Sequence, residues 1–315
     1  MDKCPNKFKH LGFLAETRTR RNFAGLLAAA ALLPWTARAD ADPHPPPATR
    51  PPKKEYPLFD EATANVIPTV GFQSRISFHD SMVRLVCNGV IDREKFSALQ
   101  KYNGALPPEL LKTMEKPSGK PIHLTRENAT HYVNFLWPVG LSNRLGANKE
   151  SPMVGPDLPN FASTGGWNLG KEPNGGVYFN KFPIIKLRPK AEALAVRVAK
   201  STYRPCCGNS TFFQDCNHGS ALFAVLQLGA AQGLTEDQLY KEALAFNSFW
   251  FPSYYISTAL YLKVGRKINW RDVDAKMIMG SDFSSGGPWQ QNVLVPLQKF
   301  PHLFPQPEGG AKCGA

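Results

Sequence analysis

The pattern of apolar and polar residues along the chain predicts a protein built mostly of α-helices. In several segments apolar residues recur every three or four positions, which is typical of a helix with one buried face. Capping residues, glycine or proline mark the ends of these segments. The expected helices span 73–88, 93–99, 125–145 with a kink or break at Pro138, 189–199, 220–230, 236–250 and 254–264.

Local signals fix the starts of three of these helices. Thr235 and Gln238 have the spacing of a capping box ahead of 236–250. Asp92 is a cap candidate for the short helix that follows it. Pro189 suits the first turn of a helix, where a missing backbone N–H costs nothing.

One segment departs from the helical pattern. Pro173-Asn174-Gly175-Gly176 lies between aromatic and β-branched residues, which favours a hairpin. The predicted fold is therefore mostly α, an irregular helical single domain with a small β-hairpin element near 160–187.

The first 39 residues have the layout of an export signal. Basic residues ending in Arg20-Arg21 precede an apolar stretch at 24–35, and Ala37-Arg38-Ala39 supplies a small-residue cleavage motif. The stretch is too short to span a membrane as a helix of the mature chain. Arg20-Arg21 followed by Asn22-Phe23 resembles twin-arginine signals, although the next two residues, Ala24-Gly25, replace the commoner Leu-Lys. The resemblance implies export of a folded protein to the periplasm.

Composition divides the rest of the chain into a linker and a domain. Residues 40–57 hold a dense run of prolines, which predicts an extended spacer before a domain at 58–315. Without residues 1–39 the chain keeps 30 basic and 23 acidic residues, a formal charge of +7.

No basic helix with interleaved aromatic residues occurs, so we expect no nucleic-acid partner. The domain also lacks an apolar run long enough for a membrane span.

Cysteine usage adds a constraint. Cys4 leaves with the signal, and the remainder holds Cys87, Cys206, Cys207, Cys216 and Cys313. This number is odd, so in an oxidising compartment at least one cysteine must be free, bound to metal or paired between chains.

The segment 203–219, YRPCCGNSTFFQDCNHG, predicts a metal site. Cys216 and His218 are two residues apart, so in an extended chain they would face the same side. Cys206 or Cys207 would add another soft donor when the loop closes. Such a set suits copper, zinc or an iron–sulfur centre. Copper is favoured, because export and the thioether pair Met277-x-Met279 are both typical of copper-handling proteins.

Two other interpretations of this segment stay open. A disulfide could join Cys206 or Cys207 to Cys216, or could reach Cys87 or Cys313. Alternatively, Cys216 could be a nucleophile at the start of a helix. This stretch resembles the nucleophile helix of papain-like cell-wall endopeptidases and transglutaminase-like enzymes. Those families place a histidine in a downstream strand, whereas only His302, in a proline-rich tail, follows here.

Three further residues are weaker ligand candidates. His79 precedes Cys87 by eight positions, which puts both on one face if 73–88 is helical. Glu127 and His131 are spaced i, i+4 in the expected helix 125–145, as in a carboxylate–histidine pair.

The sequence thus predicts an exported protein that binds a soft metal and has a redox or metal-handling role. Its partner would be a small molecule or a metal donor or acceptor protein. If it is an enzyme, a metal-dependent oxidoreductase is expected. The alternatives are a disulfide-stapled periplasmic binding protein without metal and a cysteine hydrolase with Cys216 as the nucleophile.

Overall fold

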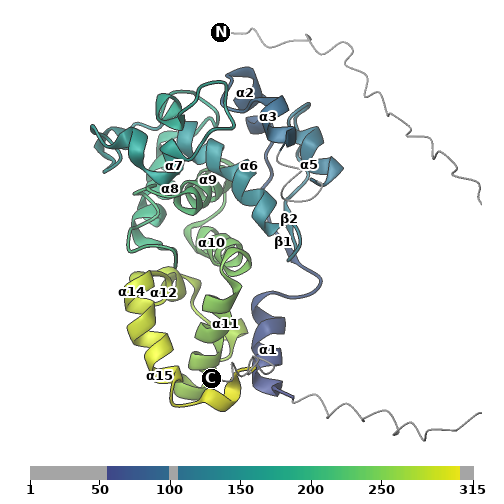
Figure 1. The fold of residues 1–315 in the computed structure, drawn as a ribbon, viewed down its shortest axis with the longest axis vertical. Coiled ribbons are helices and arrows are strands. Elements are labelled where there is room, and N and C mark those ends of the chain that lie inside the picture. The colour runs from purple at the N-terminus through teal and green to yellow at the C-terminus, as the bar shows by residue number, and fades with distance from the viewer. Residues whose placement is uncertain (1–54, 99–105, 306–315) are drawn as a thin grey trace, which may run out of the picture. The chain divides into compact units, whose positions relative to one another are not determined.

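Helix α9, Asn217–Ala231, is the central element of the fold (Figure 1). Its residues from Gly219 to Ala230 are all buried, as expected for a helix that is apolar on every side. In the computed structural model, which describes residues 55–98 and 106–305, helices α6, α8 and α10 surround α9. They span Ala129–Ser142, Pro189–Ser201 and Glu236–Trp250.

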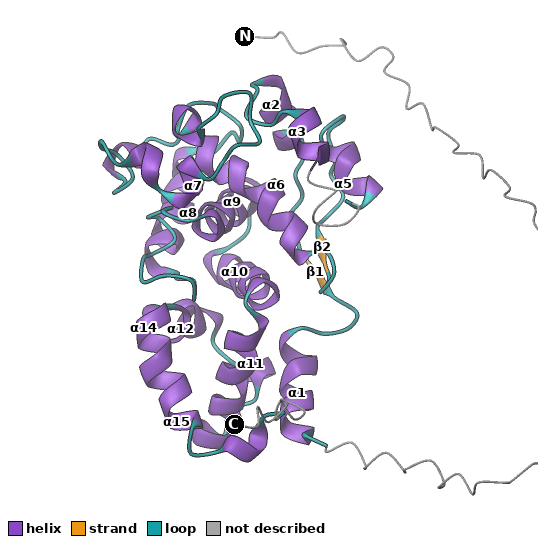
Figure 2. Ribbon diagram, viewed as in Figure 1, coloured by secondary structure: helices purple, strands orange, loops and turns teal. Residues whose placement is uncertain are grey.

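The mostly helical prediction is confirmed (Figure 2). All described residues except Glu55 belong to one compact unit, Tyr56–Ala315. The other α-helices are α1 Pro57–Val66, α2 Ser81–Cys87, α3 Arg93–Ala98, α5 Pro108–Thr113, α7 Ala162–Gly165, α11 Pro252–Tyr261, α12 Ala275–Met279, α13 Ser281–Ser284, α14 Gly286–Trp289 and α15 Val295–Leu297. Short 3₁₀ or π turns are η1 Ala147–Glu150, η2 Leu158–Asn160, η3 Gly175–Tyr178, η4 Leu262–Arg266, η5 Trp270–Asp272, η6 Gln290–Leu294 and η7 Pro301–Leu303.

Helix α6 approaches α9 unusually closely at Gly140. A Cβ atom at this position would lie 1.9 Å from the backbone oxygen of Ser220. Pro138 stays inside α6, and Ser142 Oγ donates a hydrogen bond to its carbonyl at 2.6 Å. The close contact fixes the first turns of α9, the part of the helix that carries Cys216 at its N-cap.

The sheet does not lie where the sequence pattern placed it. Strands β1, Phe72–Gln73, and β2, His123–Leu124, form an antiparallel pair with Phe72 opposite Leu124. The β-hairpin expected near 160–187 is absent from the described residues, which form η2, α7 and η3 there. Asn174 caps η3 by accepting a hydrogen bond from Gly176 N at 2.8 Å, so the Pro-Asn-Gly-Gly segment begins a 3₁₀ turn. Trp167 Nε1 donates to Val90 O at 2.8 Å instead of packing across a strand pair.

The helix expected at 73–88 is also shorter than predicted. Only α2 is helical, and the preceding residues run extended beside 118–124, with Ser74 N bonded to Ile122 O and Ile122 N to Ile76 O. Ile76 is buried, as the helical pattern required, but it lies in this extended stretch and not on a helix.

Helix starts predicted from capping signals are confirmed. Thr235 and Gln238 form a capping box on α10, Asp92 Oδ1 accepts from Glu94 N and Lys95 N ahead of α3, and Pro189 is the first residue of α8.

The predicted signal and most of the linker lie outside the described residues. No helix in the described part of the chain combines the length and apolar character that crossing a membrane requires.

Candidate metal centre

The loop between α8 and α9 carries the cysteines and is fixed at its base. Thr211 N donates to Thr202 O at 2.8 Å, and the two threonine hydroxyls are 3.0 Å apart. Tyr203 N bonds to Met279 O at 2.9 Å, and Asn247 Nδ2 donates to Tyr203 O at 3.0 Å. The loop is therefore tied to α10 and α12 as well as to its neighbours in sequence.

Three thiol sulfurs converge in this loop. The Sγ atoms of Cys206, Cys207 and Cys216 all lie within 4.8 Å of one another. Those of Cys206 and Cys216 are 3.5 Å apart, so they touch without a covalent bond, and all three thiols are free. Cys206 is exposed, while Cys207 and Cys216 are half-buried, so the group opens to solvent on one side.

A buried arginine lies beneath the sulfurs. The Arg204 side chain is fully buried, and its Nε donates to Cys216 Sγ at 3.1 Å. Its Nη1 donates to the carbonyls of Asn209 and Ser210 at 3.0 and 2.8 Å, and its Nη2 to Phe213 O at 3.0 Å. A buried charge needs this number of partners, because burying it unpaired would cost several kcal/mol.

Asp215 balances the charge of Arg204. It forms an ion pair with Arg204 Nη2 and accepts a hydrogen bond from Asn209 Nδ2 at 2.8 Å. The thiol of Cys207 lies 3.9 Å from the same carboxylate. Arg204 and Asp215 thus close the loop electrostatically and fix the cysteines between them.

Cys216 is the residue best suited to be a thiolate. Its Sγ caps α9 by accepting from Gly219 N at 3.3 Å. Hydrogen bonds from the thiols of Cys206 and Cys207, together with the charge of Arg204, hold the pKa of Cys216 far below its usual range despite burial. Hydrogen bonds with Cys207 and Cys216 raise the pKa of Cys206. These opposite shifts favour a thiolate at Cys216 beside a protonated Cys206.

His218 does not belong to the group of ligand atoms that lie within 4.8 Å of one another. Its ring packs on Phe251 at 4.6 Å and on Trp250 at 5.8 Å between centroids. The predicted side-by-side arrangement of Cys216 and His218 assumed an extended chain, but α9 already begins at Asn217. Burial lowers the pKa of His218, which favours the neutral form of the imidazole.

The weaker ligand candidates are scattered. His79 precedes α2 and has a left-handed backbone, with φ 46°, so it does not share a helix face with Cys87. Glu127 is exposed in the turn before α6, whereas His131 is buried within that helix. Their expected i, i+4 pairing on one helix was wrong, because α6 begins only at Ala129.

The methionine pair contributes to the core. Met279 is fully buried, and its Sδ lies 3.8 Å from Asn247 Nδ2 and 4.0 Å from the hydroxyl of Tyr255. Asn247 also bonds to Tyr203 O, so Met279 belongs to the support of the cysteine loop.

The sulfur group has the dimensions of a metal site. With metal–sulfur bonds of about 2.3 Å, two sulfurs on one tetrahedral or trigonal ion lie about 3.8–4.0 Å apart. The sulfurs of Cys206 and Cys216 are 3.5 Å apart, and no pair exceeds 4.8 Å, so the separations are close to these values. Small side-chain shifts would therefore let one ion contact all three sulfurs.

Two residues important to this site escaped the sequence prediction, Arg204 and Asp215. A signal was present: a basic residue shortly before Cys206-Cys207 and an acidic residue directly before Cys216 can pair when the loop closes.

Comparison of the chain with models of protein families, with curated proteins and with solved structures finds no match.

Proposed function

We propose that the protein binds one soft metal ion, Cu(I) in preference to others, through Cys206, Cys207 and Cys216, and that it handles metal or electrons outside the cytoplasm. The observation that carries the proposal is the convergence of three free thiol sulfurs within 4.8 Å. Thiolate sulfur is the donor that Cu(I), zinc and iron–sulfur clusters prefer.

The number of donors favours copper. Structural zinc sites use four protein ligands, and the group found among the described residues offers three. Cu(I) accepts three sulfur donors, whereas Zn(II) would keep an open position for water. Arg204 would offset part of the negative charge of the three thiolates. A metal donor or acceptor protein would then be the natural partner, and a metal-dependent oxidoreductase the corresponding enzyme class.

Competition for Cu(I) tests this proposal. Reduced, metal-free protein is titrated without oxygen against a chromophoric Cu(I) chelator, and we expect one tightly held ion per chain. Proton release should accompany binding, because the thiols must deprotonate. Serine at position 206, 207 or 216 should abolish the tight complex, and His218→Phe should keep it. Failure of the wild type to compete, or indifference to all three serine changes, would contradict the proposal.

A second function is supported by the contact between Cys206 and Cys216. A thiolate 3.5 Å from a thiol is arranged for thiol–disulfide exchange. The Cys216 thiolate would attack a small disulfide and release one thiolate. Cys206 would then resolve the mixed disulfide, pass its proton to the second leaving thiolate and form a Cys206–Cys216 bond.

Mass spectrometry after treatment with oxidised glutathione separates this function from metal binding. The wild type should gain a Cys206–Cys216 disulfide, and Cys206→Ser should accumulate glutathione on Cys216. A metal-free protein that keeps all three thiols reduced under these conditions would rule the exchange out.

We also propose export by the twin-arginine route, on the basis of Arg20-Arg21, the apolar stretch 24–35 and Ala37-Arg38-Ala39. Cell fractionation in a bacterium with this pathway should find the processed protein in the periplasm. Changing both Arg20 and Arg21 to lysine should leave the precursor in the cytoplasm, while the matched pair Arg18→Lys and Arg38→Lys should not. Equal export of both variants would contradict the route.

A further inference from the structure

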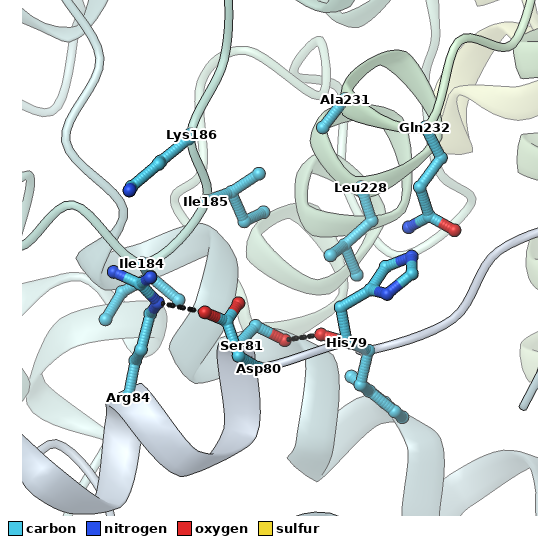
Figure 3. A pocket seen from close by; sticks show the side chains of 11 residues that line it. His79, Asp80, Ser81, Arg84, Ile184, Ile185, Lys186, Leu228, Ala231 and Gln232 are labelled. Carbon is cyan, nitrogen blue, oxygen red and sulfur yellow. Dashed lines mark hydrogen bonds and ion pairs between the residues drawn. The ribbon is translucent and has the colours of Figure 1, made fainter. Parts of the chain in front are cut away.

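A basic groove runs along the segment 184–190, built from two adjoining cavities of about 320 and 760 Å³. The cavities share Lys186, Ala231 and Gln232. Figure 3 shows the smaller one, with Leu228 and Ile185 at its floor and Lys186 and Arg84 at its rim. The groove thus combines an apolar floor with a cationic edge.

The segment that forms one wall has the alternation of a strand. Lys186, Arg188 and Lys190 are exposed and line the larger cavity, while Leu187 packs against the core. Arg188 has an extended backbone, with φ −72° and ψ 153°. Side chains two residues apart on an extended chain face the same side, so Lys186 and Arg188 lie on one side. Lys190, in the first turn of α8, adds a third cation to the same cavity.

The backbone of this wall offers an unpaired edge. Ile185 N is held by Asn143 Oδ1 at 2.8 Å, which fixes the start of the segment. The N–H groups of Lys186 and Arg188, which an extended chain directs to the same side, bond to no other described residue. An extended segment with free N–H groups can pair with an added peptide strand.

The groove has a strong charge imbalance. Asp80 is the one carboxylate among its lining residues in the described chain, and Arg84 Nε already pairs with it at 2.7 Å. Lys186, Arg188 and Lys190 have no carboxylate partner among the described residues. The lining therefore carries three uncompensated positive charges.

A strained residue stands at the far end of the groove. His79 adopts φ 46°, which is rare for residues other than glycine, and two backbone hydrogen bonds of 2.8 Å with Ser118 hold it there. Its side chain lies beside Leu228 and Gln232 at the cavity (Figure 3). Backbone strain of this kind concentrates at ligand-binding positions.

We propose that this groove binds an acidic peptide segment of a partner protein as an added strand beside 186–188. Alternate carboxylates of the peptide contact Lys186, Arg188 and Lys190, and its backbone pairs with the free edge. Apolar residues between the carboxylates lie over Leu228 and Ile185. The proposal does not depend on the metal site, since none of these residues touches the sulfur group.

Fluorescence anisotropy with the full chain tests the proposal. The probe is a labelled octapeptide of alternating glutamate and valine, and its control has lysine in place of glutamate. We expect binding of the glutamate peptide alone, weakened by salt. The triple variant K186E/R188E/K190E should weaken it about tenfold or more. The matched variant K112E/K116E/K299E, with the same charge change elsewhere, should bind within about twofold of the wild type.

Two results would overturn the proposal. One is equal binding of the peptide to the two triple variants. That result would show that the net charge of the protein, and not the groove, attracts the peptide. The other is undiminished binding of a glutamate peptide N-methylated at alternate residues, which would show that no strand pairing occurs. Loss of binding in the N-methylated peptide, together with retained Cu(I) binding in K186E/R188E/K190E, would support it.

Discussion

At the scale of single residues, Arg204 and Asp215 determine what the cysteines can do. The guanidinium of Arg204 contacts Cys216 Sγ, three backbone carbonyls and Asp215, and it is fully buried. Removing one partner of a buried pair costs about 3–5 kcal/mol. Direct substitution of Arg204 would therefore mix loss of the fold with loss of the site.

Gly219→Ala is a milder way to move Arg204. A Cβ at this position would lie 2.6 Å from Arg204 Cζ, in a region without free space. We expect a stability loss of about 1–3 kcal/mol, slower alkylation of Cys216 at neutral pH and weaker Cu(I) binding, although every thiol remains. Denaturant unfolding, iodoacetamide kinetics and chelator competition measure the three effects.

Gly208→Ala, in the same loop, is the control for this substitution. Its nearest new contact would be Ser285 Oγ at 4.0 Å, so all three quantities should stay near the wild-type values. If Gly219→Ala behaves like Gly208→Ala, Arg204 does not influence the sulfur group.

Part of the candidate site could be predicted from single residues of the sequence. Cys206, Cys207 and Cys216 were placed together from their spacing and converge as expected. His218 was grouped with them by the alternation of an extended chain, and the early start of α9 directs its ring to Phe251 instead. Arg204 was missed because its pairing with Asp215 becomes apparent only when the loop between them is taken to close.

At the scale of elements, the contact between α6 and α9 sets the position of Cys216. Local signals predicted the starts of α8 and α10, because a cap depends on residues within one turn. They failed at 160–187, where Trp167 and Tyr178 bond to the backbone of Val90 and Gly89. Contacts between residues so distant in sequence leave no trace in local periodicity.

Gly140→Ala tests the role of the helix contact. The added methyl group would overlap the carbonyl of Ser220, so α6 must shift away from the first turns of α9. We expect a loss of about 1–3 kcal/mol in the free energy of unfolding, measured in urea. Gly119→Ala is the control, since nothing lies within 4 Å of its Cβ, and equal stability of the two variants would contradict the tight contact.

At the scale of the whole molecule, the cysteine loop should couple stability to pH. The fold lowers the pKa of Cys216 below that of an unfolded thiol, about 8.5. The thiolate therefore contributes its full stabilisation above that pH, and the contribution declines as the pH falls towards the folded pKa. Lowering the pH should therefore reduce the free energy of unfolding of the reduced, metal-free protein, because Cys216 becomes protonated.

Unfolding of the wild type and Cys216→Ser, compared between about pH 9 and pH 5, measures this coupling. The difference in unfolding free energy should shrink as the pH is lowered. Thr235→Ala removes the α10 cap, which does not ionise, and should cost about 1 kcal/mol at every pH. A constant difference for Cys216→Ser would mean that its pKa is not lowered by the fold.

The central claim is that three sulfurs of one loop hold a single soft metal ion. X-ray absorption of the Cu(I)-loaded protein counts the ligands directly. We expect three sulfur neighbours and no nitrogen, with the same spectrum in His218→Phe and a loss of sulfur neighbours in Cys206→Ser. A shell that contains a histidine nitrogen, or fewer than three sulfurs in the wild type, would contradict it.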